Sequence, residues 1–233
     1  MESISEMKLE ARRILKDRWS EVVLMNLIPT LILVFLLSLL FLPLIIAAFV
    51  LFIRNGDIGG VFDKVSVTIN SDTSDWSSRF GGFFMVFINY GLSWTYLDLV
   101  RGNVGGKINP WQANLRVFQS GRGWITLGVA FFTTLFIGFW SMLFLVPGII
   151  KTYSYAQAGY LVNDIDEVDQ LSVFDYITES RRLMDGHKMD LFLLELSFIG
   201  WHILGVLSFG LGYLWIKPYI ATTEAVFYNK LIG

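Results

Sequence analysis

Residues 172–201 read SVFDYITESRRLMDGHKMDLFLLELSFIGW, in which a short basic, amphipathic segment leads into a long apolar one. The same order occurs twice more. Residues 4–27 contain ISEMKLEARRILKDRW before EVVLMNL, and residues 109–132 contain NPWQANLRVFQSGRGW before ITLGVAFF. Apolar residues at helical spacing beside clustered Lys and Arg are typical of an amphipathic helix. We interpret the three copies as one repeated unit, an amphipathic helix followed by membrane-crossing helices.

The composition indicates a membrane protein. Hydrophobic residues make up 54% of the 233 residues and charged residues only 16%, whereas a soluble domain carries about 25% charge. Four runs contain no Asp, Glu, Lys or Arg: residues 22–53, 80–97, 123–150 and 196–216. About 20 apolar residues cross a ~30 Å hydrocarbon layer as a helix. We therefore expect an all-α, polytopic helix bundle.

Several function classes are excluded by composition. The net charge of −2 argues against a nucleic-acid partner, and the absence of cysteine excludes disulfides, thiolate metal sites and thiol catalysis. With only two His we expect no metal site, and we expect no cofactor. No G-x-S-x-G or H-E-x-x-H sequence occurs, so we do not expect an enzyme. The uncharged run that begins at Val22 is too long for a cleavable signal, which predicts that the first helix is retained.

We expect one integral membrane domain over residues 1–233, with six transmembrane helices arranged as three hairpins, each preceded by an amphipathic interfacial helix. Proline-glycine and glycine-rich turns at 147–148 and 208–212 separate the later spans. In chain order the segments are an interfacial helix and span one (1–53), an external loop (54–79), span two (80–101), an interfacial helix with spans three and four (102–163), and an interfacial helix with spans five and six (164–233).

The ends of the amphipathic helices are marked by capping residues. Ser3 with Glu6 and Ser172 with Asp175 fit capping boxes. Asn109 before Pro110 fits an N-cap followed by a first helical residue, while Gly121 and Gly186 predict the ends of the second and third helices. These signals predict helix boundaries from local chemistry alone.

The amphipathic helices are expected to lie in the lipid headgroup plane, with their cations toward anionic lipid. On the second helix, Trp111, Leu115 and Phe118 are expected to form the apolar face. For residues 3–19, a plain cytosolic extension of span one remains an alternative, and ordinary topogenic charge explains the cations equally well. The candidate contacts to lipid or a partner are Arg12, Arg13, Lys16, Arg18, Arg116, Arg122, Arg181, Arg182 and Lys188.

The distribution of Lys and Arg predicts the topology. Cytoplasmic flanks carry the excess of these residues, and most of the 18 fall beside the three amphipathic helices. This bias requires residues 149–163 to cross the membrane, because otherwise the third basic segment would lie outside. We therefore expect a multi-pass protein of the bacterial plasma membrane with both termini cytoplasmic.

Ionisable groups inside a bilayer cost about 2.5–3.5 kcal/mol each on insertion scales, so each needs a reason. For the two lysines we expect the ammonium groups to reach the outer interface. For the two glutamates, which should lie at similar depth on adjacent antiparallel helices, either pairing with an inner Arg or a polar cavity for a cation or proton is possible. For the histidine we expect an interhelical hydrogen bond. The candidates are Lys151, Glu195, His202, Lys217 and Glu224.

Three stretches resemble a bacterial integral-membrane family known only by a domain-of-unknown-function label. They are LFLVPGIIKTYSYAQAGYLV (143–162), ESRRLMDGHKMDLFLLELSFIGWHILG (179–205) and GLGYLWIKPYIATTEAVFYNKL (210–231). A more distant resemblance is to the membrane domain of glycerophosphodiester phosphodiesterases. The resemblance implies a multi-span protein of the bacterial plasma membrane and no particular activity.

Two functions remain open from sequence. The first is a non-catalytic membrane protein whose partners are membrane lipids, another membrane protein or a second copy of itself. The alternative is a small-solute or lipid transporter that uses the polar groups within its spans.

Overall fold

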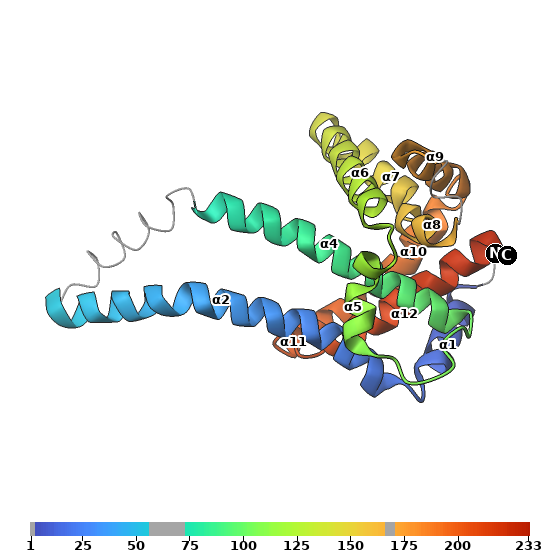
Figure 1. The fold of residues 1–233 in the computed structure, drawn as a ribbon. Helices are drawn as coiled ribbons and strands as arrows, with labels where there is room; N and C mark the ends of the chain where they lie inside the picture. Colours follow the sequence, from blue (N-terminus) through green and yellow to red (C-terminus); the bar gives the residue numbers. More distant parts are fainter. Residues whose placement is uncertain (1–2, 56–72, 166–170) are drawn as a thin grey trace. The chain divides into compact units, whose positions relative to one another are not determined.

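The computed structural model describes residues 3–55, 73–165 and 171–233, and the structural statements below concern these residues. They form eleven helices, and no strand occurs among them (Figure 1). The prediction of an all-α fold is confirmed. Most of the predicted external loop, 54–79, lies outside the described residues.

The first helices in chain order include two long ones. α2 runs unbroken through Pro29 and Pro43 for 37 residues, about 55 Å at 1.5 Å per residue. It confirms one helix where the sequence predicted one. The bounds are α1 Ile4–Leu15, α2 Trp19–Asn55, α4 Thr73–Val100, α5 Pro110–Gln119 and α6 Gly123–Leu143.

The remaining helices are shorter, apart from the last. The bounds are α7 Leu145–Tyr155, α8 Ala158–Asp164, α9 Val173–Leu183, α10 Lys188–Leu196, α11 Ile199–Leu207 and α12 Tyr213–Ile232. Contacts divide the chain into two units, residues 1–27 with 87–233 and residues 28–86. The second unit comprises the greater part of α2 and the start of α4, and the first contains every residue discussed below.

The predicted N-caps of the amphipathic helices and the glycines that end the second and third are confirmed, whereas α1 ends at Leu15, before the predicted residue 19. The carboxylates of Glu6 and Asp175 accept the backbone N–H of Ser3 and Ser172 at 2.8 and 2.7 Å. The side chain of Asn109 accepts the N–H of Trp111 at 3.1 Å. Past the ends of α5 and α9, the glycines at 121 and 186 adopt φ of 72° and 83°, the left-handed region that favours glycine.

The turn between α6 and α7 differs from the prediction. The chain reverses at Phe144, whose backbone is extended, and α7 starts at the next residue. Pro147 therefore lies in the first turn of α7, where no backbone N–H is needed. A Cβ on Gly148 would lie 2.7 Å from the Cα of Ser141, so this glycine lets the two helices approach closely. The predicted turn at Pro147 and Gly148 is wrong because these residues start the returning helix.

Two predicted spans are each broken into two helices. The fourth is interrupted between α7 and α8, and the fifth between α10 and α11. Donors from elsewhere in the chain reach backbone carbonyls beside the breaks. The Ser180 hydroxyl donates to the Ser154 carbonyl at 3.0 Å, and the Lys8 ammonium donates to the Ser197 carbonyl at 2.9 Å. Such bonds satisfy groups that a continuous helix would pair internally.

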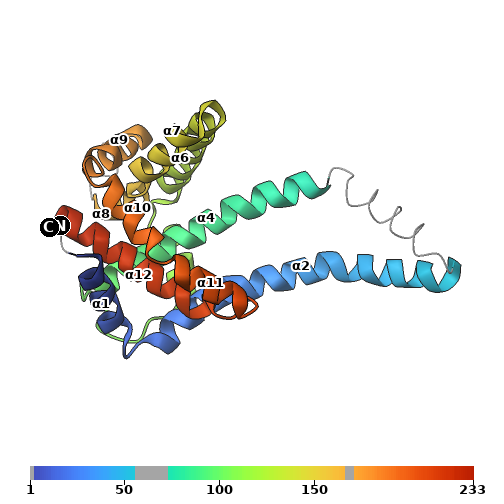
Figure 2. The same cartoon turned by 180° about the vertical axis from the view of Figure 1, so that it is seen from behind.

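The three amphipathic helices pack against the chain's own helices. α1 lies along α12, as the view from behind shows (Figure 2), and α9 packs on α6, α7 and α8. α1 buries Met7, Ala11 and Leu15 to 1% exposure or less. α12 therefore covers this face of α1.

α5 packs against the protein through the face opposite to its predicted apolar face. Trp111 is 57% exposed and Leu115 is 42% exposed, whereas Ala113 and Val117 are buried. The small buried residues allow a close approach to α4, since a Cβ on Gly91 would lie 2.8 Å from the Ala113 carbonyl oxygen. The large apolar side chains are thereby left on the outside.

Among the residues that the structure describes, two segments are long and apolar enough to cross a membrane by length and composition: Gly123–Leu143, which is α6, and Lys188–Leu207, which contains α10 and α11. These segments are consistent with membrane association.

Candidate functional site

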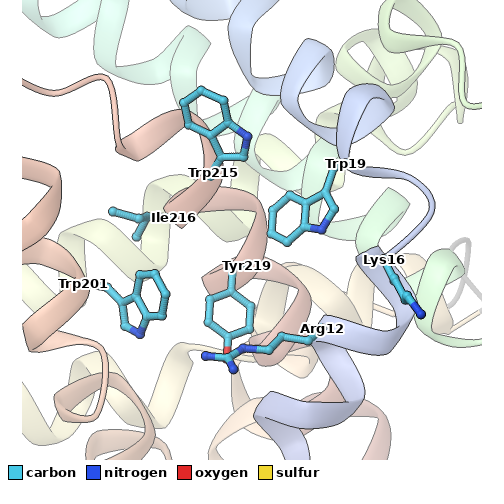
Figure 3. A pocket seen from close by; sticks show the side chains of 7 residues that line it. All are labelled: Arg12, Lys16, Trp19, Trp201, Trp215, Ile216 and Tyr219. Carbon is cyan, nitrogen blue, oxygen red and sulfur yellow. The ribbon is translucent and has the colours of Figure 1, made fainter. Parts of the chain in front are cut away.

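A pocket of about 360 Å³ lies where α1 and the start of α2 meet α11 and α12 (Figure 3). Aromatic rings form most of its wall, and two cations of α1 lie at its edge. The lining residues are Arg12, Lys16, Trp19, Trp201, Trp215, Ile216 and Tyr219. The sequence singled out only the two cations.

Arg12 is the cation that faces the rings. The central carbon of its guanidinium lies 5.2 Å from the ring centroid of Tyr219 and 5.8 Å from that of Trp201. A guanidinium within about 6 Å of a ring centroid is attracted to the π face. Lys16 lies four residues later, one helical turn away, and its ammonium points away from the rings in Figure 3. Arg12 is therefore the central charge and Lys16 a peripheral one.

The position of Arg12 is fixed by the packing of α1 on the helices behind the pocket. Lys8, one turn earlier, lies 4.0 Å from the Phe198 ring centroid. The Tyr219 hydroxyl donates to the Lys8 carbonyl at 3.5 Å, and Lys230 of α12 pairs with Glu10 at 2.6 Å. Burial lowers the pKa of Lys8, and the positive charge of Arg12 lowers it further. These contacts hold the cationic edge of α1 against the aromatic wall.

The polar groups of the pocket are mainly hydrogen-bond donors. No carboxylate lines it, and within the described residues neither Arg12 nor Lys16 has an ion-pair partner. Within the residues that the structure describes, the indole N–H groups of Trp19, Trp201 and Trp215 also donate to no protein acceptor. Indole, guanidinium and ammonium groups donate and do not accept. The arrangement suits an anionic ligand with an apolar portion.

A second polar cluster joins α7, α10 and α12. The Tyr153 hydroxyl donates to the Glu195 carboxylate at 2.7 Å. The charges of Glu195 and Glu224 lie close enough to interact. These groups could hold a shared proton or a cation between helices.

The other predicted intramembrane groups stand apart from this cluster. His202 and Lys217 are exposed. The histidine ring lies 5.8 Å from the Tyr213 ring, and it is the His202 backbone carbonyl that accepts the Tyr213 hydroxyl, at 3.3 Å. The described contacts of the His202 ring therefore include no hydrogen bond that the ring donates.

Lys151 of α7 lies beside aromatic rings. Its ammonium is 5.1 Å from the Trp140 ring centroid and 6.0 Å from the Tyr155 ring centroid. The positive charges of Arg181 and Lys188 also act on it, because α9 packs along both α6 and α7. Its predicted position at the outer interface stays a prediction.

Several cations predicted to contact lipid or a partner also bind within the chain. Arg18 donates to the Val104 carbonyl at 3.0 Å, and Arg116 pairs with Asp98. Arg122 donates to the carbonyls of residues 162 and 163 at 2.8 and 2.6 Å. Arg182 and Lys188 pair with Glu179 and Asp185 at 2.8 and 3.5 Å, while Arg13 and Arg181 are exposed.

An ion pair that the sequence did not reveal joins α8 to the loop after α4. Arg101 donates two hydrogen bonds to Asp164, at 2.7 and 2.6 Å, and one to Asn229 at 3.1 Å. The Tyr228 hydroxyl donates to the same carboxylate at 2.8 Å. Asp164 begins an acidic run of the sequence. Such a run is usually solvated, so no ion pair was expected there. No sequence signal distinguishes it from its neighbours.

The described residues contain no group of three or more His, Cys, Asp or Glu that could hold a metal ion. Comparison with curated proteins and with solved structures gives no match. A family model does match residues 145–233, with the description "Protein of unknown function (DUF975)". This match confirms the resemblance to a family of unknown function, and no match supports the one to glycerophosphodiester phosphodiesterases. From α7 to its end, the chain is thus similar to the DUF975 proteins of unknown function.

Proposed function

We propose that the protein is a multi-pass integral membrane protein of the bacterial plasma membrane that binds lipid or another membrane protein and catalyses no reaction. The observation that carries this proposal is the reversed polarity of α6. Its buried residues are Thr126, Val129, Ala130 and Thr133, whereas its exposed residues include Phe131, Leu135, Phe139 and Met142, at 45% to 91% exposure.

Small and hydroxyl-bearing residues inside, with large apolar residues outside, are typical of helices that pack in lipid. In water, such a contiguous apolar surface would favour aggregation. In a bilayer, the same apolar surface contacts the hydrocarbon chains of the lipid. The α10–α11 segment supports the same reading, because Ile199, Ile203, Val206 and Leu207 are 57% to 71% exposed.

The proposed threading has six spans in three hairpins with both termini in the cytoplasm. Its support is the placement of Lys and Arg beside α1, α5 and α9, each of which precedes an apolar stretch. The span pairs are α2 with α4, α6 with α7–α8, and α10–α11 with α12.

Because the chain contains no cysteine, single introduced cysteines test this threading without background. Lys107→Cys and Asp185→Cys, both at exposed positions, should be shielded from a membrane-impermeant maleimide in intact cells. Leu211→Cys, 67% exposed, should react. Reaction at 107 and not at 185, or the reverse, contradicts three inward-facing basic helices. Recovery of the intact chain in a detergent-free aqueous fraction contradicts the membrane assignment itself.

A second candidate function is transport of a small solute or lipid. It is favoured by the helix breaks between α7 and α8 and between α10 and α11, with Glu195 and Glu224 nearby, because discontinuous helices and polar groups within spans are features of transporters. It predicts that Glu195→Gln and Glu224→Gln alter phenotype. The first candidate predicts that they do not, and that pocket substitutions do.

A further inference from the structure

We infer that the pocket between α1, α11 and α12 binds the phosphate headgroup of an anionic phospholipid, with Arg12 on the phosphate and the glycerol and upper acyl region against the tryptophans. The inference depends on the proposed membrane location and selects lipid over a protein partner. It also names the site, which the sequence alone did not.

Charge selects an anion for this pocket. Two cations lie at its edge, no carboxylate lines it, and the indole N–H groups of Trp19, Trp201 and Trp215 are without protein acceptors within the described residues. A phosphate diester offers only acceptors to such a set. Charge-assisted hydrogen bonds from guanidinium to phosphate are among the strong ones in proteins.

The position of Arg12 selects against headgroups that carry an ammonium. The π faces of Trp201 and Tyr219 are the surfaces that would otherwise attract a choline or ethanolamine group. Arg12 already lies 5.8 and 5.2 Å from those ring centroids. A second cation there would meet like charge, so an uncharged polar headgroup such as glycerol is favoured.

The walls select a lipid over free phosphate. Rings from three helices surround a space of about 360 Å³, far larger than a phosphate ion needs (Figure 3). Trp215 is 52% exposed, which leaves one ring open to the surroundings of α12. Indole rings are amphipathic, so they can contact both a polar headgroup and the first methylenes of its chains.

The test uses the purified full-length chain in a neutral detergent, titrated with phosphatidylglycerol whose acyl chains carry bromine. Bromine quenches tryptophan fluorescence on contact. The chain contains eight tryptophans, so the quenching that belongs to the pocket is the part that Trp201→Phe removes. We expect Arg12→Gln to raise the half-maximal lipid mole fraction about tenfold, the loss typical of one charge-assisted hydrogen bond. Lys16→Gln should raise it by about two- to threefold, because its ammonium is peripheral.

Arg13→Gln is the matched control, since Arg13 is exposed on the same helix and does not line the pocket. It should bind like the unaltered chain. Equal quenching by brominated phosphatidylcholine would overturn the anionic selectivity. Full competition by inorganic phosphate or glycerol 3-phosphate would overturn the lipid assignment, and equal binding by the Arg12 and Arg13 variants would overturn the site.

If Arg12→Gln fails to fold, Trp201→Phe keeps the test decisive. It removes one indole N–H and one quenchable ring while keeping an aromatic wall. Weaker phosphatidylglycerol binding supports the site, and unchanged binding and quenching contradict it. The lipid titrations test the pocket, whereas cysteine labelling and fractionation test the membrane location. A negative lipid titration can therefore be distinguished from failure of the proposed membrane function.

Discussion

α1 and α5 are both short, basic, amphipathic helices with confirmed caps, yet they use their apolar residues in opposite ways. α1 buries its large apolar residues against α12, and Leu15 has no exposed surface. α5 turns small residues toward α4, and Leu115 stays 42% exposed. The same kind of sequence therefore yields either a docked helix or one with an outward apolar face. What decides is how closely the neighbouring helix can approach.

The largest expected effect comes from the same substitution at both leucines. Leu15→Ala should destabilise the protein by about 2–4 kcal/mol, because it removes fully buried methyl groups and leaves a cavity. Leu115→Ala should cost less than about 1 kcal/mol, because that side chain is partly exposed already. Thermal or denaturant unfolding in detergent measures both. Equal losses would show that α5 is packed as tightly as α1.

A second prediction concerns the close approach at α5. Gly91→Ala places a Cβ 2.8 Å from the backbone oxygen of Ala113, which cannot move independently of α5. We expect a loss of about 1–3 kcal/mol in unfolding free energy. Gly138→Ala is the control, because nothing lies within 4 Å of its added Cβ. It should be neutral or slightly stabilising. If both substitutions are neutral, small residues do not set the α4–α5 distance.

A third prediction concerns how the carboxylates that cap α1 and α9 respond to pH. Hydrogen bonds from Ser3 and Ser172 lower the pKa values of Glu6 and Asp175 below 4.5 and 3.8, their ordinary values. A depressed pKa in the folded state gives stability that is present above the ordinary value and lost as pH falls through the folded one. Acidification below about pH 4 should therefore fray α1 and α9 at their first turns.

The N-cap of α5 is the amide of Asn109, which does not titrate in this range, so α5 is the internal control. Hydrogen-exchange protection of the first-turn amides, corrected for intrinsic rates, measures the effect in all three helices. Glu6→Gln and Asp175→Asn should abolish the pH dependence in α1 and α9. Equal fraying of α5 would contradict a carboxylate origin.

The smallest expected effect separates the two cations of α1. By its peripheral position, Lys16→Gln should change phosphatidylglycerol binding much less than Arg12→Gln, whereas simple attraction of α1 to an anionic surface predicts equal changes of about 1 kcal/mol per cation. The brominated-lipid titration distinguishes the two. A ratio near one would favour a diffuse basic surface over a pocket.

Much of the local structure follows from short-range patterns. The all-α class, the capping boxes at Ser3 and Ser172, the Asn109 N-cap and the positive-φ glycines after α5 and α9 depend on neighbouring residues only, which is why they were predicted. The turn at Phe144 was missed because Pro147 and Gly148 suit both a turn and a first helical turn. The packing of α9 along α6 and α7 was not predicted, because no local signal reveals it.

By itself, the sequence determined the helical class, the caps of the amphipathic helices and the apolar character that points to a membrane, because capping, helical periodicity and hydrophobicity act over a few residues. Only the tertiary structure decided which faces are buried, where the helices break, and that Arg12 meets aromatic residues some 190 to 207 positions later. Those contacts depend on how closely two helices approach. A single stretch of sequence carries no measure of that distance.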